Sequence, residues 1–149
     1  ISGTQGDSYK MKKLIMVCLV CFLSVYAQDK MYGKVRVSKV MSIYDGDTFK
    51  VTISSWPSIA GDNVGVRVKG IDCPEMRDDD PKVKELAQQA KQYTVKRLRE
   101  GKIIWLKNIQ RDKYFRILAD VEIDGKDLGK ELLEKSLAKP YDGGTKEEW

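Results

Sequence analysis

One long amphipathic segment, between Pro81 and Gly101, divides this chain into two groups of strand-like segments, and this order constrains the fold more than any other feature. Asp80 suits the N-cap of a helix, Pro81 suits the first helical position, and Gly101 ends the pattern. Apolar side chains and one threonine recur at steps of three and four residues: Val83, Leu86, Ala87, Ala90, Tyr93, Thr94 and Leu98. The sequence therefore predicts a single helix with one buried face.

Strand patterns precede and follow this helix. Before it, we expect three strands, over residues 34–40, 48–53 and 64–71. Asp45-Gly46 is a turn signal between the first two strands, Gly65 and Gly70 mark bends in the third, and residues 54–63 have the composition of a loop. After the helix, we expect two strands, a short second helix and a loose tail from Pro140, with the strands over 102–109 and 116–123 and the helix over 128–137.

Three strands, a helix and two further strands do not form the alternation of strands and helices that predicts a parallel sheet. The order is typical of a small α+β domain built on a five-stranded, antiparallel OB-type β-barrel with the helix across one end. Closing the sheet into a barrel would also protect the edges of strands that are too few to cover one another.

The first residues have the pattern of a processing signal. Residues 1–10 lack a starting Met and resemble neither helix nor strand, so we expect a leader of uncertain origin. Met11-Lys12-Lys13, an apolar run over 14–25 and the small residue Ala27 predict a signal peptide over residues 11–27. The domain would then be residues 28–149, secreted or periplasmic and free of the membrane after cleavage; the alternative is a surface protein tethered by an uncleaved anchor.

Composition narrows the chemistry. The 149 residues contain no histidine, which excludes hydrolases that use imidazole as a base or a metal ligand. Cys73 is the single cysteine of residues 28–149, so no internal disulfide can form there. Without Lys10, Lys12, Lys13 and Asp7, 24 basic and 21 acidic residues remain, a net charge of +3. This charge is compatible with a polyanionic partner but does not require one.

Carboxylates cluster around two turns. In Asp45-Gly46-Asp47-Thr48, the acids either cap a hairpin turn or place Asp47 against a hard cation. In the second case Asp72, at the end of the strand predicted over 64–71, is the second ligand. Cys73 has no base partner, so we expect its backbone carbonyl, and not its thiol, to act there. Glu75 follows the rigid Pro74 and is either a surface acid or a general base.

Two arginines and two tyrosines complete the set. Arg67 and Arg116 each lie on or beside a predicted strand, where a planar guanidinium is the right shape for a phosphate; each is alternatively a structural ion-pair partner. Tyr114, next to Lys113, offers a ring for base stacking, and Tyr141 offers a second one. Stacking tolerates any base, which suits binding without sequence preference.

Taken together, these motifs resemble the staphylococcal nuclease (thermonuclease-like) family over about residues 35–141. The resemblance implies an OB-type barrel and Ca²⁺-dependent, sugar-nonspecific cleavage of DNA and RNA at the P–O5′ bond, leaving 3′-phosphates. It implies that Arg67, Glu75 and Arg116 are catalytic and that Asp47, Asp72 and the carbonyl of Cys73 bind Ca²⁺. Phe115 stands where a glycine is common in the family, so a loop that needs a positive φ would displace Arg116.

The residues leave one competing function open. A noncatalytic OB module would bind single-stranded nucleic acid through its charged face and tyrosines without hydrolysing it. Under either hypothesis we expect a monomer with no stable protein partner, and under the nuclease hypothesis we expect single-stranded or frayed DNA and RNA to be the preferred substrates.

Overall fold

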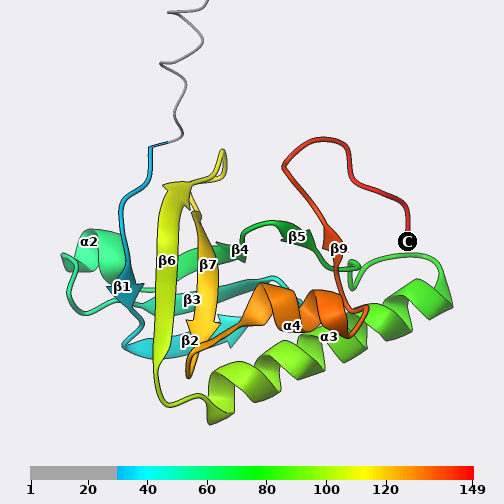
Figure 1. The fold of residues 1–149 in the computed structure, drawn as a ribbon, viewed down its shortest axis with the longest axis horizontal. Helices are drawn as coiled ribbons and strands as arrows, with labels where there is room; N and C mark the ends of the chain where they lie inside the picture. The colour runs from blue at the N-terminus through cyan, green and yellow to red at the C-terminus, as the bar shows by residue number, and fades with distance from the viewer. Residues whose placement is uncertain (1–29) are drawn as a thin grey trace, which may run out of the picture. The chain divides into compact units, whose positions relative to one another are not determined.

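The computed structural model describes residues 30–149, which form one folded unit (Figure 1). The predicted leader over residues 1–10 and the predicted signal peptide over residues 11–27 lie outside the described residues. None of the helices within residues 30–149 combines the length and the apolarity that a bilayer crossing requires.

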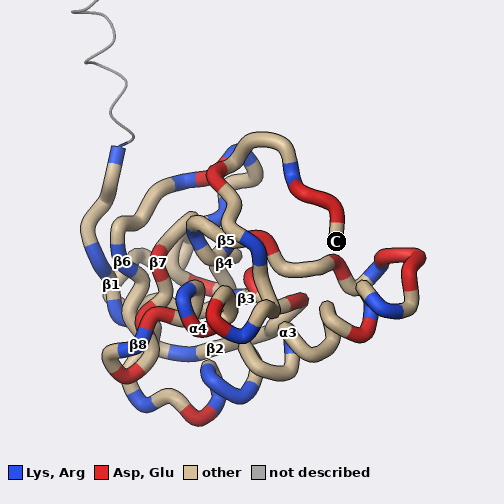
Figure 2. The backbone as a smooth tube through the Cα atoms, turned by 45° about the vertical axis from the view of Figure 1, so that its right-hand side comes forward, with Lys and Arg blue, Asp and Glu red and all other residues tan. Residues whose placement is uncertain are grey.

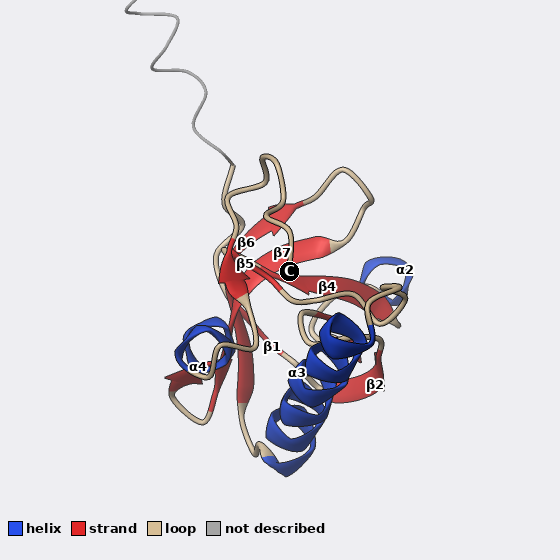
Figure 3. Ribbon diagram, turned by 90° about the vertical axis from the view of Figure 1, so that its right-hand side faces the viewer, coloured by secondary structure: helices blue, strands red, loops and turns tan. Residues whose placement is uncertain are grey.

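Five strands of five or more residues make the body of a curled sheet: β2 (Lys39–Ile43), β3 (Thr48–Thr52), β4 (Val64–Val68), β6 (Ile104–Arg111) and β7 (Ile117–Ile123). Two short strands extend it, because β1 (Val35–Arg36) pairs with β6 and β8 (Lys126–Asp127) pairs with β7. The order along the sheet is β1-β6-β7-β4-β3-β2. The sheet curls as a half-barrel (Figure 3), which confirms the predicted OB-type α+β fold.

The strands depart from the prediction in two ways. The segment predicted as one strand over 34–40 divides into β1 and β2, which pair with different strands, β6 and β3. The pairing of β4 with β7 is parallel, with Val66 opposite Ile117, and not antiparallel as predicted. The parallel pairing is possible because a long helix and β6 connect the two strands and return the chain to the direction of β4.

The long helix α3 (Pro81–Glu100) forms as predicted. Asp80 caps it, accepting a hydrogen bond of 2.8 Å from the backbone N–H of Lys82. Its apolar stripe faces the sheet and is buried at Val83, Ala87, Ala90, Thr94 and Leu98. Gly101 is the C-cap, and its extended backbone ends the helix. A Cβ there would lie 2.4 Å from Cγ2 of Ile123, so only glycine permits this close approach of helix and sheet.

Two further helices are short. α4 (Leu128–Glu134) begins at its N-cap Asp127 and ends before the predicted residue 137. Its end is set by Ser136, whose φ of 57° is left-handed and turns the backbone so that the N–H of Leu137 bonds to Leu132 O at 2.9 Å. α2 (Ser58–Gly61) is a single turn inside the segment predicted as a loop.

The core fills the concave side of the sheet. Its largest fully buried side chains include Phe49, Val51, Leu106, Ile123 and Leu132, which come from β3, β6, β7 and α4. Each such side chain contributes roughly 1.5–3 kcal/mol relative to an exposed position. The strands that carry the charged residues discussed below are therefore anchored by the main core.

The chain after α4 is not loose at Pro140, contrary to the prediction. β9 (Lys139–Pro140) pairs with β5 (Ile71–Asp72), and Lys139 lies opposite Asp72. β5 begins after Gly70, whose φ of 79° makes the bend that the sequence predicted in the third strand. This small second sheet brings β9 next to the one acidic residue of β5, Asp72.

Candidate active site

The turn at Gly46 is packed between α3 and the chain after β5. The hydroxyl of Thr94, on α3, donates a hydrogen bond of 2.6 Å to Gly46 O. A Cβ at position 46 would lie 2.7 Å from Sγ of Cys73 and 2.9 Å from Cβ of Ala90, so the position requires glycine. The neighbouring carbonyl of Asp47 accepts from Val68 N at 2.9 Å. The orientation of the Asp47 carboxylate is therefore fixed by its backbone.

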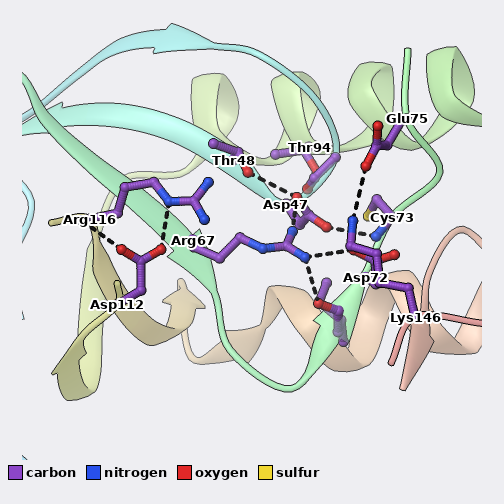
Figure 4. Close-up of polar contacts among 12 residues, drawn as sticks. Asp47, Thr48, Arg67, Asp72, Cys73, Glu75, Thr94, Asp112, Arg116 and Lys146 are labelled. Atoms are coloured by element: carbon purple, nitrogen blue, oxygen red, sulfur yellow. Dashed lines mark hydrogen bonds and ion pairs between the residues drawn. The ribbon is translucent and has the colours of Figure 1, made fainter. Parts of the chain in front are cut away.

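Asp47 and Asp72 converge on Arg67, as the sequence predicted for the two acids (Figure 4). Asp47 is 3% exposed and Asp72 is 5% exposed, so neither charge is balanced by solvent. Arg67 forms an ion pair with Oδ1 of Asp47 and donates from Nη2 to Oδ1 of Asp72 at 2.7 Å and to Ile71 O at 3.2 Å. The other oxygen of Asp47 accepts from Cys73 N at 2.6 Å.

Arg116 lies on the same face of the sheet as Arg67. A Cβ added to Gly65, two residues before Arg67 on β4, would lie 3.1 Å from Cγ of Arg116. In Figure 4 the Arg116 side chain extends in the direction of Asp47 and Arg67. The parallel pairing of β4 with β7 thus places Arg116 on the face of the sheet that carries Arg67 and its two acid partners.

Asp112 holds Arg116 in place, a role that the sequence analysis did not assign. Its Oδ1 accepts from the backbone N–H groups of Tyr114 at 2.8 Å and Arg116 at 2.9 Å, and its Oδ2 accepts from Nε of Arg116 at 2.7 Å. Burial disfavours the charged form of Asp112, but these hydrogen bonds outweigh it and lower its pKa. The spacing of an acid four residues before an arginine, across a tight loop, is the signal that could have indicated this contact.

The loop does adopt a positive φ at Phe115, of 62°. With this φ at Phe115, Asp112 contacts the residues on either side, Tyr114 and Arg116, and so holds Arg116 to the loop. The phenylalanine side chain is largely exposed to solvent, so its size causes little steric conflict.

Glu75 lies at the rim of the cluster. Its side chain is 68% exposed and forms an ion pair of 3.0 Å with Lys146, which also contacts Oδ1 of Asp72 at 3.0 Å. Lys146 therefore bridges the carboxylates of Glu75 and Asp72 (Figure 4). Lys146 belongs to the segment predicted as a loose tail, and no local pattern around it indicates this contact.

The predicted stacking residues differ in their surroundings. Tyr114 is exposed, and its ring lies 5.2 Å from Nζ of Lys113 and 5.3 Å from Cζ of Arg116. Its ring is thus next to the second arginine and open to solvent. Tyr141 follows β9; its N–H bonds to Gly70 O at 3.0 Å and its hydroxyl donates to Gly144 O at 3.1 Å.

The buried groups of the site have shifted pKa values. Burial raises the pKa of the Cys73 thiol to about 12, against the opposing effect of Arg67. This agrees with the prediction that the thiol is not a nucleophile, since it stays protonated at neutral pH. Burial also raises the pKa of Asp45, which Arg67 opposes. Among the described residues, Oδ1 of Asp45 is a buried oxygen that accepts no hydrogen bond.

The donors of this cluster suit a hard divalent cation. Carboxylate oxygens are the ligands that Ca²⁺ and Mg²⁺ prefer, and Asp45, in the same turn as Asp47, has a buried oxygen without a hydrogen-bond partner. Within residues 30–149, however, no three acidic or thiol side chains converge as a ready metal cluster. The guanidinium of Arg67 pairs with both Asp47 and Asp72, and its single positive charge neutralises one of their two negative charges.

Residues of both charges are spread along the described part of the chain. Lys and Arg alternate with Asp and Glu along most of the backbone in Figure 2.

The comparisons with known proteins agree with this geometry. The family described as "Staphylococcal nuclease homologue" matches residues 65–148, more than half of the chain, a range that includes both arginines, Asp72 and Glu75. Nucleases of this family are generally metal-dependent.

Three curated relatives carry endonuclease names. "Probable endonuclease LCL3" of Colletotrichum graminicola is 28% identical over 145 residues, which cover 81% of this chain and 51% of the relative. "SPbeta prophage-derived endonuclease YokF" and "Endonuclease YncB" of Bacillus subtilis are 35% and 33% identical over 107 residues, 68% of this chain and 34% and 48% of the relatives. The chain thus spans between about a third and about a half of the length of these relatives. The family match and the arrangement of the charged residues together show that this chain belongs to the family of staphylococcal nuclease homologues.

Proposed function

We propose that this protein is a Ca²⁺-dependent, sugar-nonspecific nuclease that hydrolyses phosphodiester bonds of DNA and RNA and leaves 3′-phosphates. The observation that carries the proposal is the convergence of two arginines with buried carboxylates, because Arg67 and Arg116 share one face of the sheet with Asp47 and Asp72. The endonuclease names of the relatives and the family match support the same activity.

In this proposal each residue has a distinct role. Arg67 and Arg116 bind the phosphate, whose negative charge grows in the transition state, and Glu75 accepts the proton of the attacking water. Asp47, Asp72 and the carbonyl of Cys73 would hold a divalent cation, which when bound would supply charge stabilisation at the phosphate. Arg67 becomes free to bind phosphate only when the charges of Asp47 and Asp72 are balanced in another way, because it is paired with both of them here.

The substrate range follows from how the nucleic acid is contacted. Phosphate contacts carry no sequence information, and the exposed ring of Tyr114 can stack on any base. Stacking needs an unpaired base, so single-stranded or frayed DNA and RNA are the preferred substrates. The enzyme works as a monomer in this proposal. If residues 11–27 act as a signal peptide, it works outside the cytoplasm, and sequencing the mature N-terminus would find Gln28.

The test is the release of acid-soluble nucleotides from DNA and from RNA, with Ca²⁺ and with EGTA. We expect hydrolysis of both polymers that stops in EGTA. Full activity in EGTA would exclude the role of the cation. Binding of single strands without hydrolysis at any Ca²⁺ concentration would favour the noncatalytic OB module instead.

Arg116→Lys is the sharpest variant. It keeps the charge but removes the planar fork, and we expect turnover to fall on the order of a hundred-fold or more. Arg97→Lys is the matched control, because Nε of Arg97 also contacts a carboxylate, Glu131, at 2.7 Å, but between α3 and α4. Equal turnover in these two variants would remove the role of Arg116.

Glu75→Gln should likewise abolish most turnover while nucleotide binding persists, because the amide cannot accept the proton. Arg67→Ala is a poor test of catalysis. It would leave two buried carboxylates without their partner, which costs about 3–5 kcal/mol for a broken buried pair. Its loss of activity would then report the loss of the fold.

A further inference from the structure

The segment after β9 folds back onto the charged cluster. The backbone N–H of Tyr141 bonds to Gly70 O at 3.0 Å, and Gly143, with a φ of 97°, turns the chain. Farther along, Nζ of Lys139 lies 4.9 Å from the centre of the Trp149 ring, so the segment closes on its own strand. Figure 1 shows this segment as a loop that leaves β9 and returns towards the chain after β5.

This loop delivers one charged group to the site. Nζ of Lys146 lies 3.0 Å from Oδ1 of Asp72 and 3.0 Å from Oε1 of Glu75, and so bridges a buried acid and an exposed one. Burial pulls the pKa of Lys146 down, but the hydrogen bonds with Glu75 and Asp72 outweigh this effect and raise it. Lys146 therefore keeps its positive charge at neutral pH.

Glu75 depends on such a contact more than the other acids do. Asp47 and Asp72 are buried and held by Arg67, whereas the Glu75 side chain is 68% exposed and its carboxylate is held by Lys146. An exposed glutamate samples several rotamers, and a general base works only within hydrogen-bond reach of the proton that it accepts. Displacement of a reacting group by about 1 Å can lower a rate on the order of a hundred-fold.

We propose that Lys146 is a positioning residue for Glu75: the loop over residues 141–149 completes the active site by tying the general base to Asp72. This inference rests on the proposed nuclease function and adds a residue to it. Lys146 acts through Glu75, so its effect must disappear when Glu75 can no longer act as a base.

The experiment uses the full chain and compares Lys146→Met, Lys146→Arg and, as a matched control, Lys130→Met. Lys130 is an exposed lysine of α4, and its substitution removes the same charge elsewhere. For each variant we would measure kcat and KM on single-stranded DNA, Ca²⁺ affinity by calorimetry, and thermal unfolding to verify the fold. The same Lys146→Met change is also made in the Glu75→Gln background.

We expect Lys146→Met to lower kcat on the order of ten- to a hundred-fold, with KM changed by less than about three-fold. We expect Lys146→Arg to restore most of kcat and Lys130→Met to match the wild type. Ca²⁺ should bind Lys146→Met tighter, on the order of five-fold, because a positive charge next to Asp72 has been removed. In the Glu75→Gln background, the lysine substitution should change kcat by less than about two-fold.

Three results would overturn the inference. The first is an unchanged kcat in Lys146→Met; the second is a higher kcat, which would mean that the lysine blocks the site. The third is an undiminished effect of Lys146→Met in the Glu75→Gln background. A wild-type chain that neither binds Ca²⁺ nor hydrolyses nucleic acid would overturn the proposed function and this inference together, whereas an active wild type with a fully active Lys146→Met would overturn this inference alone.

Discussion

Phe115 is a bulky side chain in a backbone conformation that favours glycine, and replacing it should stabilise the protein. Its φ of 62° is left-handed, which costs an L-residue roughly 1–2 kcal/mol. Glycine avoids this strain but loses about 0.5–1 kcal/mol more backbone entropy on folding. The side chain is 79% exposed, so little packing is lost, and the unfolded chain buries part of the ring as well. Phe115→Gly should therefore raise the free energy of unfolding by about 0.5–1 kcal/mol.

The assay is urea unfolding followed by tryptophan fluorescence, with a thermal scan in which we expect Tm to rise by roughly 2–5 °C. Phe115→Ala separates the two contributions, because alanine removes the ring but keeps the strain, and it should not stabilise the protein. Gly125 provides the reverse control: its φ is 81° and a Cβ there would meet no atom within 4 Å. Alanine at this position gains the strain of a left-handed φ and loses less backbone entropy on folding than glycine does. Gly125→Ala should therefore lower the free energy of unfolding by about 0.5–1 kcal/mol. If the free energy of unfolding of Phe115→Gly is no higher than that of Phe115→Ala, backbone strain at position 115 does not limit the stability of this loop.

Three other predictions concern the turn, the thiol and the acid-dependence of the site. Gly46→Ala should destabilise by about 1–3 kcal/mol, because its Cβ would meet Cys73 Sγ at 2.7 Å and Ala90 Cβ at 2.9 Å; an unchanged urea midpoint would contradict this. The Cys73 thiol, with its pKa raised to about 12, should resist a disulfide reagent at pH 8 until denaturant is added, and rapid labelling of the native protein would refute its burial. Asp112 has a lowered pKa in the folded state, so its contribution to stability is complete above its unfolded pKa of about 4 and is lost as pH falls through the folded value. Asp112→Asn should make the thermal stability less dependent on pH between about pH 2 and 5, and identical pH profiles of variant and wild type would exclude this linkage.

The features that the sequence predicted well are encoded over short distances along the chain. The cap at Asp80 and the apolar stripe of α3 depend on residues one to four positions apart, so the pattern of residues 81–100 was sufficient. The bend at Gly70 and the turn at Gly46 also follow from a single residue type. The convergence of Asp47 and Asp72 was predicted because their strands were expected to lie side by side, and in the structure both acids contact Arg67.

The features that the sequence missed join distant parts of the chain. The parallel pairing of β4 with β7, which sets Arg116 on the same face of the sheet as Arg67, depends on how α3 and β6, which lie between these strands in the chain, pack in the fold. Lys146 and Glu75 are 71 residues apart, and a lysine in a glycine-containing tail has no local pattern that names its partner. Local hydrogen bonding and side-chain periodicity therefore allowed most helices and strands to be predicted from the sequence. Short motifs along the chain indicated most of the charged residues of the site. Only the packing of those elements decided which charges meet, because the energy of an ion pair depends on distance in space and not on separation along the chain.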